Sequence, residues 1–180
     1  MSMSVESIVI ATDLNKTFKA EQKGLDDVQA LQGINMQIKT GQLTALVGPD
    51  GAGKTTFLRL IAGLYKPTAG SLEVLGMDVA KDPQSVQDRI SYMPQKFGLY
   101  EDLSIQENLD LYADLHGVPM NVRKERFARL LKITDLARFT ERPAGKLSGG
   151  MKQKLGLACT LVRSPELLLL DEPSVGVDPL

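Results

Sequence analysis

The sequence predicts an α/β fold with a mainly parallel central sheet, antiparallel strands at the N-terminus and an inserted helical subdomain. Three observations carry this prediction. Segments typical of strands recur along the first 93 residues, with helical segments between them. Apolar runs at residues 43–47 and 167–170 are typical of buried strands in a parallel sheet. Between these runs, over about residues 99–150, helical patterns dominate and indicate the inserted subdomain.

The first part of the chain alternates strand and turn signals. Residues 8–11 are apolar and mostly β-branched, and residues 34–38 alternate apolar with polar, so both predict strands joined by a polar hairpin loop at 19–27. After a turn at Gly41, residues 43–47 predict a buried central strand. A glycine-rich loop then leads into a predicted helix at 54–62, which Gly63 would end.

The next segments predict short elements and then longer helices. Residues 71–75 and 90–93 predict strands, and residues 83–88 a short helix. Ser104 and Glu107 have the spacing of a capping box, which predicts a helix that ends near residues 116–117. A second amphipathic helix is expected at 121–133, and a third from Ser148 to Arg163.

Composition limits the class of protein. The 180 residues suit one domain, and 43% hydrophobic with 24% charged residues excludes a mainly disordered chain. The net charge of −1 gives no electrostatic reason to expect a nucleic-acid partner. The single cysteine, Cys159, excludes an internal disulfide and fits a reducing cytosol. Neither a membrane-spanning run nor a signal peptide is expected.

The sharpest motif is a P-loop between the predicted strand at 43–47 and the helix that follows. Glycines let backbone N–H groups turn towards phosphate oxygens, and the start of a helix favours negative charge. The lysine can reach the β- and γ-phosphates, and the threonine hydroxyl can bind Mg²⁺. The expected nucleotide-binding residues are Gly48, Pro49, Asp50, Gly51, Ala52, Gly53, Lys54, Thr55 and Thr56. The alternative is an ordinary glycine-rich turn.

An acidic pair follows the apolar run at 167–170. The strand would bring Asp171 and Glu172 to the carboxyl edge of the sheet, where ligands bind in open α/β folds. Asp171 suits a contact to Mg²⁺, and Glu172 suits a base that polarises the attacking water. The alternative is that the two acids begin a solvated loop.

A third motif lies before that strand. The residues LSGGMKQ place Ser148 at a helix start with two glycines behind it, which suits a second anion-binding site. The alternative is a helix cap with a flexible loop. The residues of this motif that we expect to contribute are Leu147, Ser148, Gly149, Gly150 and Gln153.

These three motifs, in this order, resemble the ATP-binding domain of ABC (ATP-binding cassette) transporters, and the resemblance covers essentially the whole chain. Residues 92–95, YMPQ, resemble the Q-loop of that family, with Gln95 as its glutamine. Residues 173–178 resemble the D-loop, with Asp178 as its aspartate. Phe18 stands where the family has an aromatic residue that stacks on adenine, although a packing role for Phe18 remains open.

The resemblance implies a P-loop NTPase fold and an ATPase that needs ATP and Mg²⁺. Thr55, Gln95 and Asp171 would serve the metal, and Glu172 and Gln95 would be catalytic. Two ABC domains, in a homodimer or in tandem, would each hold ATP between one P-loop and the signature LSGGMKQ of the other. The helical insert would contact an integral membrane permease, most similar to bacterial export systems of the ABC-2 type. The expected location is cytoplasmic, peripheral on the inner face of the cell membrane.

One feature departs from the family pattern. The family domain continues to a strand that ends in a switch histidine, so the chain is expected to be C-terminally truncated at residue 180 and poorly active as it stands. His116 precedes the signature and cannot be that histidine. The rival functions are a soluble ABC ATPase that acts on ribosomes or DNA, a non-hydrolysing ATP-gated module and a small-molecule kinase. Glu172 opposes the second and LSGGMKQ the third.

Overall fold

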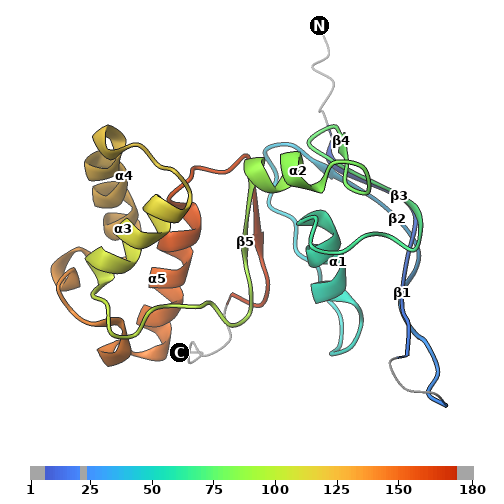
Figure 1. Ribbon diagram of the computed structural model, residues 1–180, viewed down its shortest axis with the longest axis horizontal. Helices are drawn as coiled ribbons and strands as arrows, with labels where there is room; N and C mark the ends of the chain where they lie inside the picture. The colour runs from blue at the N-terminus through green and yellow to red at the C-terminus, as the bar shows by residue number, and fades with distance from the viewer. Residues whose placement is uncertain (1–6, 21–23, 174–180) are drawn as a thin grey trace, which may run out of the picture. The chain divides into compact units, whose positions relative to one another are not determined.

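A computed structural model of the chain describes residues 7–20 and 24–173. The chain divides after Ile90 into two compact units, which are described separately (Figure 1). The first unit contains an antiparallel sheet and two helices. The second contains a pair of strands and a group of three longer helices.

The sheet of the first unit has four strands in the order β2-β1-β3-β4. The strands are β1 (Ser7–Phe18), β2 (Val28–Lys39), β3 (Ala69–Val74) and β4 (Met77–Asp78). β1 and β2 form the predicted hairpin, with Phe18 opposite Val28. Both strands are longer than the sequence predicts. Their register shifts at four places, and each shift breaks the alternation of apolar and polar residues that reveals a strand.

Two helices accompany this sheet, α1 (Lys54–Ile61) and α2 (Pro83–Arg89). Helix α1 contacts β2 and β3 and buries Phe57, Leu60 and Ile61. Both helices were predicted within one or two residues at each end, because a glycine and an aspartate with a following proline mark their starts.

The expected strand at residues 43–47 is wrong for this structure. The segment has no regular secondary structure, and Leu43 and Val47 are almost fully exposed. An apolar run provides the surface of a buried strand but not its hydrogen-bonding partner, and neither described sheet includes this segment. The segment therefore has the composition of a buried strand but lacks the backbone hydrogen bonds to a neighbouring strand that would form one.

Two strands of the second unit run side by side, β5 (Ile90–Met93) and β6 (Leu167–Leu170). The backbone N–H of Asp171, just past β6, donates to the carbonyl of Met93, the last residue of β5, at 2.9 Å. The two strands therefore end at the same edge and run parallel, as the sequence predicts. β6 is only half-buried, apart from the buried Leu169.

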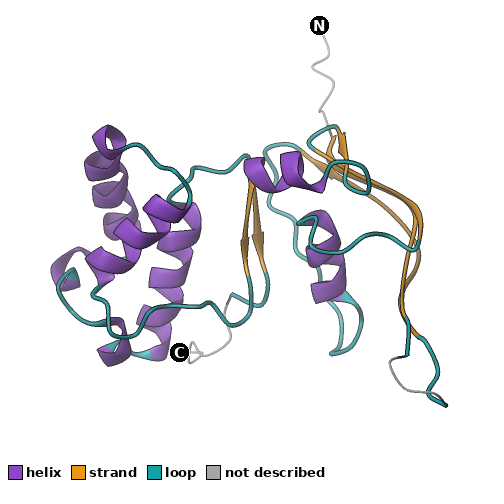
Figure 2. Cartoon of the chain, in the orientation of Figure 1, coloured by secondary structure: helices purple, strands orange, loops and turns teal. Residues whose placement is uncertain are grey.

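Three helices pack together in the second unit (Figure 2), α3 (Ile105–Leu115), α4 (Met120–Ile133) and α5 (Gly149–Leu161). Short 3-10 turns, η1 (Ala137–Phe139) and η2 (Ala144–Lys146), connect α4 to α5. Ile105, Leu109, Leu155 and Cys159 belong to their shared hydrophobic core and are fully buried. No helix in the described part of the chain is both long enough and apolar enough to cross a bilayer.

The predicted capping box of α3 is present. The hydroxyl of Ser104 accepts from the N–H of Glu107 at 3.2 Å, and the Glu107 carboxylate accepts from the N–H of Ser104 at 2.7 Å. These bonds satisfy two amides that would otherwise have no partner at the helix start, and they hold the pKa of Glu107 below its usual value. Ser148 caps α5 in the same way by accepting from the N–H of Met151.

Candidate functional site

The P-loop is an exposed irregular loop that leads directly into α1 (residues 48–53). Gly51 and Gly53 adopt φ values of +78° and +85°, a region that side chains disfavour. A Cβ on Gly53 would lie 2.6 Å from the carbonyl oxygen of Ala30 in β2, so no side chain fits there. Glycine at this position lets the loop approach the sheet and turn into the helix.

The start of α1 is a suitable place for an anion. Gly53 is the N-cap, and a glycine has no side chain that could accept a hydrogen bond from the first turn of the helix. The first N–H groups of a helix carry partial positive charge and lack partners within the helix. An oxyanion at this position can therefore accept several backbone hydrogen bonds together.

Lys54 adds a full positive charge inside the same loop. Its ammonium donates to the carbonyl oxygens of Gly48 and Pro49 at 2.8 and 2.9 Å, so the loop curves around the Nζ atom. The N–H of Ala52 also donates to the carbonyl of Pro49 at 3.2 Å, which closes a turn in the loop. The loop, the helix start and the ammonium together form a small site whose chemistry suits phosphate oxygens.

Phe18 lies in the same unit, at the end of β1. Its ring meets the ring of Tyr65 edge to face, with 5.3 Å between the centroids. The Lys16 ammonium lies 4.9 Å from the centre of the Phe18 ring. Phe18 is half-buried, so the structure gives it a packing contact and also leaves part of its surface open to solvent.

The acidic pair lies at the carboxyl end of β6. Asp171 is buried, with 3% of its surface exposed, and Glu172 is half-buried. Glu172 adopts a φ of +51°, a left-handed conformation that is unfavourable for a residue with a side chain. Such strain persists only where surrounding contacts impose it, and it is concentrated at functional sites.

Two side chains, one in β5 and one just after it, hold the two acids. The Tyr92 hydroxyl donates to Asp171 Oδ2 at 2.9 Å, and Gln95 Nε2 donates to Glu172 Oε2 at 2.8 Å. The structure therefore brings together Gln95, Asp171 and Glu172, which the sequence singled out separately. Sequence reasoning missed Tyr92, because a tyrosine in a short strand carries no sign of a partner 79 residues away.

The signature LSGGMKQ begins helix α5. Leu147 is buried, Ser148 is the N-cap, and Ser148 and Gly149 are exposed, so this helix start is open to solvent. Further along α5, Gly156 allows a close approach, because a Cβ there would lie 3.1 Å from side-chain atoms of Met93 and Phe97. This approach brings α5 against the end of β5 and the segment that follows Gln95.

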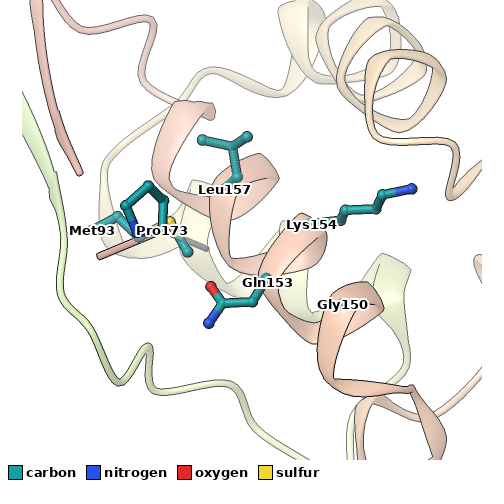
Figure 3. A pocket seen from close by; sticks show the side chains of 6 residues that line it. All are labelled: Met93, Gly150, Gln153, Lys154, Leu157 and Pro173. Carbon is teal, nitrogen blue, oxygen red and sulfur yellow. The ribbon is translucent and has the colours of Figure 1, made fainter. Parts of the chain in front are cut away.

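A pocket of about 170 Å³ opens between α5 and the two strand ends. Figure 3 shows its lining, in which apolar side chains of Met93, Leu157 and Pro173 accompany Gly150, Gln153 and Lys154 of the signature helix. The pocket therefore lies beside the acidic pair and the signature within the second unit.

The segment after Gln95 is tied to the helical group by contacts that the sequence did not reveal. Asn108 is completely buried and bonds to the backbone of Tyr100, Leu103 and Ser104. The Lys152 ammonium, within the signature, pairs with Glu101 at 2.6 Å. The Tyr112 hydroxyl donates to the carbonyl of Gly98 at 2.6 Å, and burial raises the pKa of Tyr112 to about 12.

The remaining predicted residues have simpler surroundings. Asp178 lies outside the described residues. His116 is the C-cap of α3. Its pKa is lowered mainly by burial and to a smaller extent by the positive charge of Arg163. No group of three or more His, Cys, Asp or Glu side chains in the described part of the chain could hold a metal. Oxygen donors such as Asp171 and Gln95 nevertheless suit Mg²⁺, which is usually bound by one or two carboxylates together with substrate phosphates.

Comparison with known proteins gives consistent matches. The sequence model of the ABC transporter family matches residues 31–175. A probable multidrug ABC transporter ATP-binding protein of Escherichia coli, YbhF, is 54% identical over 97% of this chain and 29% of its own length. The bacitracin transport ATP-binding protein BcrA of Bacillus licheniformis is 37% identical over 98% of this chain and 54% of its own length. The chain thus spans about a third to a half of these curated relatives.

Solved structures agree with the sequence matches. A dimeric post-hydrolysis structure of the ATP-binding cassette MJ0796, bound to ADP and Pi, superposes with a TM-score of 0.80 at 28% identity. The match covers 94% of this chain and 76% of that one. The chain therefore has the fold of these cassettes, which confirms the fold class predicted from the sequence.

Proposed function

Since this chain belongs to the ABC transporter family, we propose that it binds ATP with Mg²⁺ and that ATP hydrolysis powers export through a membrane permease. The observation that carries the proposal is the P-loop, in which an uncapped helix start and the Lys54 ammonium converge on one small site. Backbone N–H groups and an ammonium together favour a polyphosphate over a neutral ligand.

Each part of the nucleotide has candidate partners. The phosphates would lie on Gly48, Pro49, Asp50, Gly51, Ala52, Gly53, Lys54, Thr55 and Thr56, and the adenine on Phe18. Thr55, Gln95 and Asp171 offer oxygen ligands for Mg²⁺, which neutralises charge on the phosphates when it is bound.

Hydrolysis needs a group that takes a proton from water. Glu172 has that chemistry, because its carboxylate follows a strand end and is already held by Gln95 Nε2. We infer that Gln95 orients this carboxylate and responds to the state of the nucleotide. The glutamine amide can donate and accept hydrogen bonds. Gln95 can therefore release Glu172 and contact a water molecule or the metal ion instead.

The signature points to a second ABC domain, in a homodimer or a tandem protein. Leu147, Ser148, Gly149, Gly150 and Gln153 would contact the ATP held by that domain, with Asp178 contributing from the D-loop. MJ0796 is a dimer in its solved structure, which supports this proposal. Residues 1–180 would then form an ABC ATP-binding domain with a helical insert at about 99–150.

The partner in the membrane is inferred from relatives. YbhF and BcrA are named as multidrug and bacitracin transport proteins, which favours export over a soluble role on ribosomes or DNA. The permease would bind the helical insert, and the domain would lie on the cytoplasmic face of the cell membrane.

Two substitutions test the proposal. Lys54→Ala removes a charge-assisted contact of about 1.5–3 kcal/mol, so the Kd for ATP measured by calorimetry should rise by about tenfold to a hundredfold. Lys39→Ala, which removes an exposed lysine of β2, is the matched control and should leave the Kd unchanged. An unchanged Kd in Lys54→Ala would exclude the P-loop as the phosphate site.

Glu172→Gln tests the base separately. The amide cannot accept the proton of the attacking water, so ATP should still bind while phosphate release falls close to background. Glu125→Gln, on the exposed face of α4, is the control for loss of one negative charge. These turnover measurements require the whole protein with its second ABC domain. A Glu172→Gln protein that hydrolyses ATP at the wild-type rate would move the base elsewhere.

A further inference from the structure

We propose that Tyr92 is a positioning residue for the bound metal, because its hydroxyl fixes the orientation of the Asp171 carboxylate. The inference rests on the proposed function, in which Asp171 serves Mg²⁺. Tyr92 belongs to the segment YMPQ, in which the sequence singled out only Gln95, and the inference assigns Tyr92 to the metal rather than to the nucleotide.

The geometry is that of a partly buried, charge-assisted hydrogen bond between a half-buried tyrosine and a buried aspartate. Tyr92 Oη lies 2.9 Å from Asp171 Oδ2, and Asp171 has only 3% of its surface exposed. The main chains of the two strand ends are joined as well, through the N–H of Asp171 and the carbonyl of Met93. The tyrosine and the aspartate therefore belong to one rigid pair of parallel strands, in which neither backbone moves freely against the other.

A fixed donor matters because a carboxylate is otherwise poorly oriented. The terminal torsion of aspartate is broad, so the plane of the carboxylate can rotate at little cost. A hydroxyl bonded to one oxygen restricts that rotation and determines the direction of the other oxygen. Hydrogen bonds to ionised groups are about twice as strong as neutral ones, and burial shields them from competing water.

The bond of Gln95 to Glu172 is a weaker candidate for such a role. Gln95 is exposed and its partner is half-buried, so water competes for both groups. Partners that orient metal ligands from outside the coordination sphere commonly change metal affinity by about ten- to a hundredfold when they are removed. Tyr92 makes the contact expected of such a partner, and the carboxylate that it contacts is buried.

Tyr92→Phe is the direct test, because it removes one oxygen and keeps the ring. A fluorescent ATP analogue is titrated onto the purified chain in EDTA and then at increasing MgCl₂. We expect the affinity of Tyr92→Phe for the analogue in EDTA to equal that of the wild type. Added MgCl₂ raises this affinity, and the MgCl₂ concentration that gives half of the rise should be about tenfold higher in the variant. Binding of Mn²⁺ in the presence of the same analogue, followed by electron paramagnetic resonance, should weaken by a similar factor.

Two further variants make the result specific. Tyr100→Phe is the matched control, because Tyr100 is exposed on the segment before α3, and its curves should overlay those of the wild-type chain. Asp171→Asn removes the proposed ligand charge and should weaken the metal effect at least as much as Tyr92→Phe. Circular dichroism establishes that each variant is folded at the temperature of the titration.

The outcomes separate this inference from the proposed function. If Asp171→Asn weakens the metal effect while Tyr92→Phe matches the wild type, Tyr92 is a packing residue and the inference is wrong. If Asp171→Asn also matches the wild type, or if the wild-type chain shows no metal effect, the assignment of Asp171 fails and the inference fails with it. A Tyr92→Phe protein whose affinity for the analogue falls by the same factor in EDTA and in MgCl₂ also overturns the inference, because Tyr92 would then support nucleotide binding or folding.

Discussion

Replacement of Asn108 tests how firmly the segment after Gln95 is held to the helical group. Asn108 is completely buried in α3, where its Oδ1 accepts from the N–H of Tyr100 at 3.0 Å. Its Nδ2 donates to the carbonyls of Tyr100, Leu103 and Ser104 at 3.0, 3.2 and 2.9 Å. Leucine has a similar size but cannot make any of these bonds, so Asn108→Leu removes the polar contacts and largely keeps the volume.

The structure limits the size of the effect. All three carbonyls keep another donor, because Tyr100 O also accepts from the N–H of Leu103, Leu103 O from that of Ala144, and Ser104 O from the backbone N–H of residue 108. The Tyr100 N–H then bears most of the loss. Its hydrogen bond is partly buried, and the loss of a partner by a buried donor costs about 1–3 kcal/mol, so the lower part of that range applies here. We therefore expect Asn108→Leu to lower the free energy of unfolding by about that amount.

Urea unfolding followed by circular dichroism measures this change, with Asn121→Leu on the exposed start of α4 as the control. Asn108→Asp should be worse at neutral pH, because a carboxylate would face three carbonyl oxygens, and should recover as acid protonates it. An Asn108→Leu protein within about 0.5 kcal/mol of the wild type, which is the usual range for surface changes, would refute the reasoning.

Three further predictions concern the Phe18 ring, the glycines of the P-loop and the capping box of α3. Phe18→Ala should weaken ATP and GTP by about 1–3 kcal/mol each and leave tripolyphosphate binding unchanged, as competition titrations would show, and no change in either nucleotide would mean that Phe18 only packs against Tyr65. Gly53→Ala should lower the melting temperature and the affinity for ATP more than Gly51→Ala, because both have positive φ but only a Cβ at residue 53 meets backbone within 4 Å; equal effects would contradict this. Glu107 has a folded pKa below its unfolded value, so its contribution to stability is present above that unfolded value and is lost as the pH falls through the folded pKa. The difference in melting temperature between wild type and Glu107→Ala should therefore shrink on acidification, and a constant difference from pH 7 to 3 would argue against the capping box.

Features that depend on neighbouring residues could be predicted from the sequence. Ser104 and Glu107 are three residues apart, and the bonds they make are dictated by the geometry of a helix start. The glycines of the P-loop, the start of α5 at Ser148 and the strand at 90–93 are of the same kind. In each case, residues close together in the sequence are enough to indicate both the element and where it begins.

Features that depend on distant partners could not be predicted. Tyr92 and Asp171 meet because β5 and β6 lie side by side, and nothing in YMPQ or LLLLDE states that pairing. The run at 43–47 shows the opposite failure, since its composition suits a buried strand and the structure gives it no ladder. Most of β1 was not predicted either, because its register shifts interrupt the alternation and depend on pairing with β2 and β3.

Burial of the lone thiol has a practical consequence for experiments on this chain. Cys159 is enclosed by the core of the helical group, and burial raises its pKa, so hardly any thiolate is present near neutral pH. Maleimides and other alkylating probes react with the thiolate and should leave this residue untouched while the chain is folded. A cysteine introduced at an exposed position would then be the one site that is modified. Fluorophores or spin labels could be attached to such an introduced cysteine without first replacing Cys159, the one cysteine of the natural sequence.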